Sequence, residues 1–240
     1  MTYCVGLLLK AGLVLLSDTR TNAGLDNISV YRKMFTFEEP GERVIVMMTA
    51  GNLSVTQTTL ARLGEAVDDP EATPQTSIMR AESMLDVATI TGEMLSHVTA
   101  ETKARMDRMN QAATASMIVA GQRRGGRMRL FLIYPEGNFI EATDDTPYLQ
   151  IGEHKYGKPI LDRVITADTP LEEARKAVLL SMDSTLRSNL SVGMPLDMAI
   201  IETDALRVSE HRRIEANDED FAAMSAAWSQ ALRDAFARIG

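Results

Sequence analysis

Apolar residues form short runs at the start of the chain, and turn-forming residues separate these runs. Residues 3–9 and 13–17 are joined by Lys10-Ala11-Gly12, where glycine can adopt the positive φ of a tight turn. A second pair of runs, 34–37 and 44–49, flanks the turn-like composition Glu38-Glu39-Pro40-Gly41-Glu42. The pattern predicts two hairpins, so that four strands precede the first helix.

Helical spacing follows these strands. Between residues 53 and 67 apolar side chains recur every three to four positions, and a second periodic stretch runs from Ile78 through Leu85 and Ala88 to Leu95. The link between the two stretches is a polar loop with two prolines, a local feature that marks no domain boundary. We expect two successive helices covering one sheet face.

The second half of the chain alternates between strands and helices. Strands are expected at 116–121, 127–134 and 139–142, with a hairpin signal at residues 135–138. A helix is expected to begin at Thr169-Pro170-Leu171-Glu172, with Thr169 as its N-cap and Pro170 at the first helical position. The core face of this helix is expected to comprise Leu171, Ala174, Val178 and Met182.

A last strand pair, 196–202 and 206–209, precedes an apolar stripe at helical spacing near the C-terminus. We expect Trp228 of this stripe to lie in the core and not to form a ligand platform. The stripe comprises Phe221, Met224, Trp228, Leu232 and Phe236.

The order of elements favours two packed sheets with helices on both outer faces over a regular βαβ alternation. A chain of 240 residues with 45% hydrophobic content can bury a full core, and no linker interrupts it. We therefore expect a single domain spanning residues 1–240.

Charge narrows the class of partner. The net charge is −8, which disfavours nonspecific attraction to nucleic acid or to anionic membranes and favours protein or peptide partners. The early apolar runs are interrupted by Lys10 and Asp18, so neither a signal peptide nor a membrane span is expected there. Cys4, the only cysteine, is expected to be a buried strand residue in a reducing, cytoplasmic compartment.

Three other features of the sequence bear on function. The three histidines are scattered without chelating spacing, so no metal site is expected. A basic turn, 123–129, is expected to be solvated, with a subunit or acidic-partner contact as the alternative. A phosphate-binding glycine loop followed by Lys and Ser or Thr does not occur, so ATP would have to be handled by another protein and no cofactor is expected.

Thr2 follows the initiator Met1 and precedes the first strand. Removal of Met1 would leave a threonine with a hydroxyl and a free α-amine. A threonine hydroxyl needs a nearby base at neutral pH, and an α-amine with a reference pKa of about 8 can serve as one. Thr2 is therefore a candidate nucleophile that carries its own base.

Two charged residues are expected near Thr2. The hairpin returns Asp18 to the Thr2 end of the first strand, and Lys33 lies just before the strand at 34–37. A lysine held charged by Asp18 would lower the pKa of the Thr2 amine and keep it able to accept the hydroxyl proton. The alternatives are that Asp18 pairs with Arg20 or merely ends a strand, and that Lys33 is a solvated surface residue.

Several segments resemble the proteasome-type threonine peptidases of the N-terminal nucleophile hydrolases. They are Thr2 with the first strand pair, residues 17–24, residues 32–35 and Met48-Thr49-Ala50-Gly51. Within that superfamily, residues 3–7, 21–29 and 148–161 resemble Anbu, the bacterial ancestral beta subunit. The match extends over nearly the whole chain.

The resemblance implies an α+β fold, a four-layer αββα sandwich, and self-assembly into a ring-like or helical homo-oligomer. It implies Thr2 as nucleophile, Asp18 and Lys33 as the groups that orient and polarise it, and the Gly51 amide as oxyanion donor, with Ser191 in the same catalytic set. Thr21, Asn22 and Thr49 are the implied substrate-binding residues.

The sequence departs from the proteasome pattern at a few positions around this set. Glu153 follows Gly152 where a serine is expected, and Asn22 replaces a hydroxyl residue. Near the end of the pattern, Ser188 stands in an aspartate position and an extra residue precedes Gly193. Ordinary proteasome rates or specificity are therefore not assumed.

The sequence leaves three functions open. The leading hypothesis is a self-compartmentalising threonine peptidase that cleaves peptide amide bonds after removal of Met1, with a possible separate ATP-dependent or operon partner. The alternatives are a proteolytically weak scaffold particle and an amidase acting on a small or unusual amide.

Overall fold

The computed structural model describes residues 2–22, 28–106 and 113–239. The first two strands, β1 (Tyr3–Leu9) and β2 (Gly12–Asp18), form the predicted hairpin, in which Cys4 lies opposite Ser17. They occupy the centre of a five-stranded sheet of order β10-β1-β2-β11-β12. The other three strands are β10 (Tyr148–Gly152), β11 (Leu196–Glu202) and β12 (Glu210–Ile214).

A second five-stranded sheet is formed by consecutive strands in the order β5-β6-β7-β8-β9. Between β2 and β5 in the sequence, β3 (Arg20–Asn22) and β4 (Ile28–Val30) form a separate two-stranded sheet. The strands of the second sheet are β5 (Met34–Glu39), β6 (Arg43–Gly51), β7 (Ala115–Arg123), β8 (Arg129–Ile133) and β9 (Phe139–Glu141).

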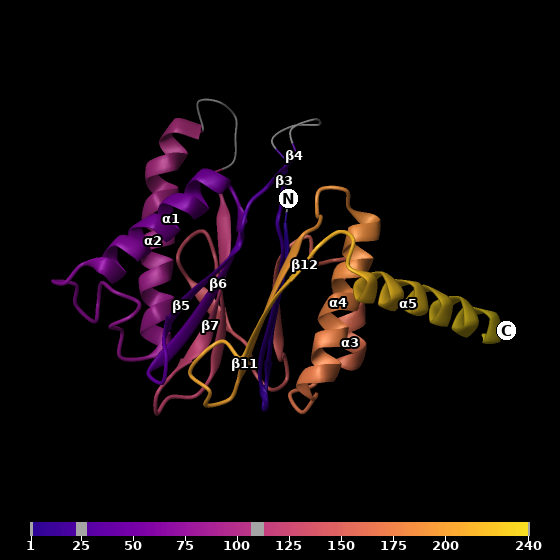
Figure 1. Ribbon diagram of the computed structural model, residues 1–240. Coiled ribbons are helices and arrows are strands. Elements are labelled where there is room, and N and C mark those ends of the chain that lie inside the picture. The colour runs from indigo at the N-terminus through magenta and orange to yellow at the C-terminus, as the bar shows by residue number, and fades with distance from the viewer. Residues whose placement is uncertain (1, 23–27, 107–112, 240) are drawn as a thin grey trace.

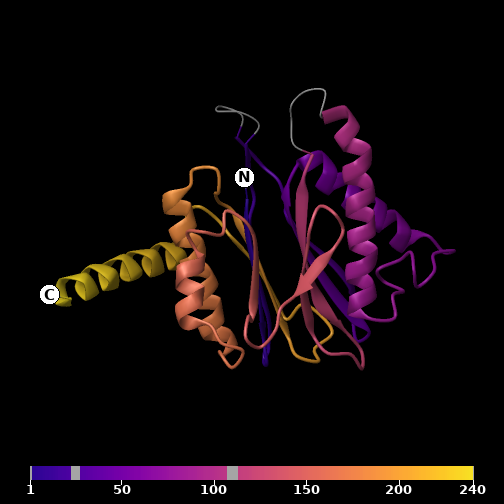
Figure 2. The same ribbon diagram turned by 180° about the vertical axis from the view of Figure 1, so that it is seen from behind.

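Helices cover the outer face of each sheet (Figures 1 and 2). The second sheet is covered by α1 (Leu53–Asp68) and α2 (Met84–Met106), and the first by α3 (Lys158–Val164) and α4 (Leu171–Ser188). The last helix, α5 (Glu219–Arg238), extends away from the sandwich (Figure 1). The fold is the expected four-layer αββα sandwich.

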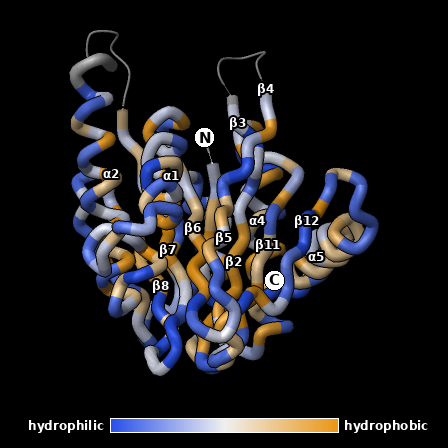
Figure 3. Tube along the Cα trace, turned by 60° about the vertical axis from the view of Figure 1, so that its left-hand side comes forward, coloured by the Kyte–Doolittle hydropathy of each residue, from blue (hydrophilic) through white to orange (hydrophobic). Residues whose placement is uncertain are grey.

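The alternation of side chains along β1 explains the layering. Tyr3, Val5 and Leu7 belong to the core between the first sheet and α4, whereas Cys4 belongs to the core between the two sheets. Successive strand residues point to opposite faces, so a strand that is apolar at every position must be covered on both sides. Apolar segments accordingly run through the middle of the molecule in Figure 3.

Some predicted boundaries were wrong. Among the described residues, six strands and not four precede the first helix, because β3 and β4 are too short for their pattern to be recognised. The second helix begins at Met84, since the Ser83 hydroxyl accepts a hydrogen bond from the Asp86 amide and so caps the helix there. The buried Ile78 belongs to the preceding turns, not to this helix.

Two further local predictions were wrong. Thr169 does not cap α4; its hydroxyl accepts a hydrogen bond from Thr166 N (2.9 Å), and Pro170 is the N-cap. The last strand begins at Glu210, whereas 206–209 form the connection from β11. The predicted core face of α4 is correct, with Ala174, Val178 and Met182 fully buried.

The C-terminal stripe is only half buried, contrary to expectation. Phe221 and Met224 pack against the core, but Trp228 is partly exposed and Phe236 is 82% exposed. The reason is geometric, because α5 leaves the body of the molecule after its second turn (Figures 1 and 2). No helix in the described ranges is both long enough and apolar enough to span a membrane.

Candidate functional site

The first sheet brings Thr2 and Asp18 together. Tyr3 pairs with Gly152 on one side, and Cys4 pairs with Ser17 on the other, so Asp18 ends β2 beside the start of β1. The amide of Tyr3 donates a hydrogen bond to Asp18 Oδ1 (3.1 Å). Thr2 itself is buried, with 6% of its surface exposed.

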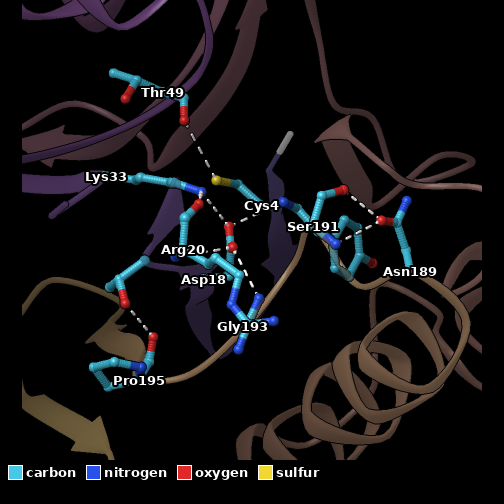
Figure 4. Close-up of polar contacts among 11 residues, drawn as sticks. Cys4, Asp18, Arg20, Lys33, Thr49, Asn189, Ser191, Gly193 and Pro195 are labelled. Carbon is cyan, nitrogen blue, oxygen red and sulfur yellow. Dashed lines mark hydrogen bonds and ion pairs between the residues drawn. The ribbon is translucent and has the colours of Figure 1, made fainter. Parts of the chain in front are cut away.

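Four donors surround the Asp18 carboxylate, and we call Asp18 with Tyr3, Arg20, Lys33 and Gly193 the Asp18 cluster. Figure 4 labels Asp18, Arg20, Lys33 and Gly193 of this cluster. Oδ1 accepts from Lys33 Nζ (2.8 Å) and Tyr3 N (3.1 Å). Oδ2 accepts from the amides of Arg20 (3.2 Å) and Gly193 (3.2 Å). Only an ionised carboxylate accepts all four bonds, so the cluster is built around an anion.

Lys33 is held on several sides. Its Nζ also donates to the Arg20 carbonyl (2.5 Å), and its own carbonyl accepts from Thr49 N (3.0 Å), which joins the start of β5 to β6. Both members of the Asp18–Lys33 ion pair are buried. Burial raises the pKa of the Asp18 carboxyl above its ordinary value, while the charge of Lys33 and the backbone donors oppose that rise.

Gly152 and Glu153 hold the backbone of Thr2. The Glu153 amide donates to the Thr2 carbonyl (2.7 Å). Gly152 has φ of +80°, and a Cβ there would overlap the Thr2 carbonyl oxygen. Glycine is thus required at this position by both conformation and space. The departure at Gly152-Glu153 therefore lies in direct contact with the candidate nucleophile.

Gly51 lies at the exposed end of β6. Its φ is +109°, and a Cβ would lie 2.5 Å from the carbonyl oxygen of Thr114, so this position also requires glycine. Gly51 and Gly152 both line one cavity of about 500 Å³, which borders the ends of β6 and β10. Because Gly152 contacts Thr2, this cavity is next to the candidate nucleophile.

The loop after α4 brings Ser191 near the cluster without joining it to Thr2. The Ser191 hydroxyl donates to Asn189 Oδ1 (2.5 Å), and its amide donates to the same oxygen (3.0 Å) (Figure 4). Ser188 is the last residue of α4. Asn189 thus provides the side-chain acceptor for Ser191. The extra residue relative to the proteasome pattern comes just before Gly193, whose amide donates to Asp18 Oδ2.

The expected substrate-binding residues lie on two segments. Thr21 is the central residue of β3 and pairs with Ser29 of β4. Thr49 is buried, and its carbonyl accepts from the Cys4 thiol (3.7 Å) while its amide bonds to Lys33. The backbone of Asn22 belongs to β3, but its side chain lies outside the described part of the structure, as do residues 23–27 of the resembling segment.

Sequence reasoning did not predict the backbone donors of the cluster. Arg20 was considered only as a side-chain partner of Asp18, yet it takes part through its amide and carbonyl. Its guanidinium instead bonds to the Leu190 carbonyl (2.8 Å). Gly193 was noted only as a departure. The nearest hint of its role in the sequence is that residue 193 is a glycine, because a Cβ there would collide with Arg20.

The chain matches a protein-family model over most of its length. Residues 2–201 match the family model described as proteasome subunit. Among curated proteins, none matches the chain.

Solved structures match almost the whole chain. Anbu from Yersinia bercovieri is 46% identical with a TM-score of 0.91, the match covering 99% of this chain and 97% of that one. Anbu from Hyphomicrobium sp. strain MC1 is 50% identical with a TM-score of 0.88, covering 99% and 98%. The helical assembly of the Anbu complex from Pseudomonas aeruginosa is 45% identical with a TM-score of 0.93, covering 99% and 97%.

Three observations indicate the same family. They are the layered sandwich, the Asp18 cluster at the start of β1 and the sequence identity over almost the full chain. The chain belongs to the proteasome subunit family and, within it, to the Anbu (ancestral beta-subunit) proteins.

Proposed function

We propose that this protein is an N-terminal threonine hydrolase that cleaves peptide amide bonds once Met1 has been removed. The single observation that carries the proposal is the buried Asp18–Lys33 ion pair (2.8 Å) at the start of β1. Burying such a pair is costly, and a helix-covered sheet needs no charge there. A function at the adjacent Thr2 accounts for keeping it.

The proposed reaction uses the two groups of Thr2. Its hydroxyl oxygen attacks the substrate carbonyl while its α-amine takes the hydroxyl proton, and the positive field of Lys33 keeps that amine neutral enough to do so. The Gly51 amide stabilises the oxyanion. The amine then passes the proton to the leaving nitrogen, which leaves an ester on Thr2 that water hydrolyses.

The proposed substrate path runs along β3. The two-stranded sheet pairs β3 with β4 on one edge only, within the described residues. An extended peptide can add to a sheet edge through its main chain, so Thr21 would contact the acyl side of the substrate. The cavity lined by Gly51 and Gly152 borders the end of β10, where Gly152 pairs with Tyr3, the residue after Thr2.

We also propose that the chain acts as one domain and assembles with copies of itself. The first sheet takes strands from both ends of the sequence, β1 with β2 and β11 with β12, which supports a single folding unit. The related Anbu complex from Pseudomonas aeruginosa forms a helical assembly, which supports self-assembly here.

The test combines mass spectrometry with covalent labelling. Intact mass of protein purified from cells should show the loss of Met1, and a β-lactone that acylates hydroxyl nucleophiles should add once per chain. Thr2→Ala should abolish the adduct, whereas Thr56→Ala, at another buried threonine, should keep it. Retained Met1, or labelling that survives in Thr2→Ala, would contradict the proposal.

A peptide-library digest then distinguishes the substrates. Cleavage of unfolded peptides that is absent in Thr2→Ala supports the peptidase. An adduct without any peptide cleavage would instead favour an amidase acting on small amides.

A further inference from the structure

Another cavity lies at the end of the sandwich away from Thr2. β1 begins at Tyr3, next to Thr2, and ends at Leu9, so its two ends are roughly 20 Å apart at about 3.3 Å per residue. At the far end, Leu8, Leu9 and Lys10 line a cavity of about 640 Å³. This volume is typical of small-molecule sites. The cavity is therefore a place for a ligand that is separate from the candidate nucleophile.

Both sheets contribute to the walls of this cavity. The turn after β1 belongs to the first sheet, and the connection between β7 and β8 belongs to the second. Met128 and Ala142 line the cavity and are also buried members of the core between the sheets. Leu9, which is 4% exposed, belongs to the core under α4. Part of the lining is therefore apolar and held in place by the two cores.

A buried amide fixes the polar part of the lining. Gln122 lines the cavity although it is only 2% exposed. Its Nε2 donates to the Gly126 carbonyl (2.9 Å) and to Asp204 Oδ1 (2.7 Å), and its Oε1 accepts from the Asp204 amide (2.8 Å). An amide oxygen can accept two hydrogen bonds, so Oε1 has one acceptor position that no described residue fills. A hydrogen-bond donor on a ligand would complete it.

The charge of the lining is negative. Four carboxylates and two cations line the cavity, and both cations are already paired. Lys10 Nζ lies 2.6 Å from Asp168 Oδ1, and an Arg127 nitrogen lies 3.6 Å from Glu141 Oε1. The remaining carboxylates of the lining form no ion pair with a described residue, and they are Asp144, Asp145 and Asp204. The cavity therefore favours a cationic ligand.

The positions of these carboxylates exclude a bound metal ion. Asp144 and Asp145 lie in the two-residue turn closed by the Thr143–Thr146 bridge, whereas Asp204 lies in the connection from β11 to β12. Among the described residues, no three acidic, histidine or cysteine side chains are grouped closely enough to hold a metal. A ligand that pairs with both turns needs two separated positive charges with an apolar chain between them.

We propose that this cavity binds an aliphatic polyamine. One ammonium group pairs with Asp204 and donates to the open position of Gln122 Oε1, and another pairs with Asp144 and Asp145. The methylene chain between them packs on Leu8 and Met128, as the stem of a lysine side chain packs on apolar surface. A single lysine side chain carries one ammonium group and cannot reach both turns, so a free polyamine fits the cavity better than a basic peptide.

Calorimetric titration of the full chain with spermidine tests the site, at about 150 mM salt to screen long-range attraction. Binding should saturate at one molecule per chain. Asp144→Asn with Asp145→Asn should weaken it by at least about tenfold, since charge-assisted bonds are lost. Glu65→Gln with Asp68→Asn, which removes two exposed carboxylates of α1, is the matched control and should leave the affinity unchanged. Equal weakening in both double variants would reduce the effect to net charge and overturn the proposal.

The choice of ligand tests the chemistry. Butane-1,4-diamine should bind at least about tenfold more tightly than butylamine, which has the same chain but one ammonium group. Equal affinities would overturn the proposal, as would displacement of spermidine by an equal concentration of Mg²⁺ or tighter binding of a tri-lysine peptide. Thr2→Ala should bind spermidine as the wild type does, so the result is independent of the proposed hydrolase activity.

Discussion

The Asp18 cluster and the outer half of α5, which carries Trp228, Leu232, Phe236 and Ile239, both reverse the usual distribution of polarity. In the cluster, a buried ion pair joins the end of β2 to the residue before β5, whereas on α5 aromatic and aliphatic side chains are exposed. The compensation differs. Asp18 receives four hydrogen bonds from its own chain, but Phe236 remains 82% exposed. The first is a site completed by folding, and the second is an apolar surface that the folding of this chain leaves exposed.

Breaking the ion pair should have the largest effect. Lys33→Ala leaves the Asp18 charge buried without its cation, which should lower the free energy of unfolding by about 3–5 kcal/mol and abolish activity. The double variant Asp18→Asn with Lys33→Met should recover part of that stability but no activity. Urea denaturation of the three proteins measures the difference, and equal stability of the single and double variants would contradict it.

Disturbing the Thr2 backbone should rank next. Gly152→Ala places a methyl group on the Thr2 carbonyl at positive φ, so we expect a loss of at least about 2 kcal/mol. Gly64→Ala is the matched control, because a Cβ there meets nothing within 4 Å and the residue lies inside α1. The control should gain up to about 1 kcal/mol. Thermal unfolding of both variants tests the contrast.

Acidification should separate activity from stability at Asp18. Because burial raises the pKa of this carboxyl, activity should fall on acidification at a pH above the ordinary aspartate value of 3.8, by up to about tenfold per pH unit. The fold responds oppositely, since a raised pKa in the folded state means that this group favours folding more as the pH falls through that window.

The two pH profiles are measured separately, by kcat/KM and by urea denaturation, with Asp18→Asn as reference for stability. If wild type lost more stability than Asp18→Asn between the folded-state pKa and the ordinary value, the raised pKa would be refuted.

Loosening α5 should have the smallest effect. Ser225→Ala removes the hydroxyl that joins Asp183 to Arg187, and we expect a loss of about 1 kcal/mol and faster amide exchange in α5. Ser229→Ala, one turn further along the helix, should change little. Unchanged exchange in Ser225→Ala would show that Phe221 and Met224 alone hold the helix.

Much of the fold followed from local pattern. The hairpin of β1 and β2 was predictable because glycine permits its turn, and the alternation of Tyr3, Cys4 and Val5 between two cores required cover on both faces. The short strands β3 and β4 and the late start of α2 were missed. Three residues carry too little periodicity, and the cap at Ser83 competes with an apolar pattern that begins earlier.

In the candidate site too, some residues could be predicted from the sequence and others only from the structure. Thr2, Asp18 and Lys33 could be selected by chemistry and by strand order, since residue type and hairpin register are local properties of the chain, whereas Gly51 was implied only by the family resemblance. The amides of Arg20 and Gly193 could not, because a backbone donor has no signature in residue type, and Gly193 lies 175 residues from the carboxylate that it bonds.

The sequence by itself determined the layered architecture, the candidate nucleophile and its charged neighbours, because periodicity and residue chemistry are written locally. Only the tertiary structure decided which backbone groups complete the Asp18 cluster, and that the C-terminal stripe leaves the core after Met224. An apolar stripe has the same spacing whether its own chain or another covers it, so only the path of α5 through space distinguishes the two.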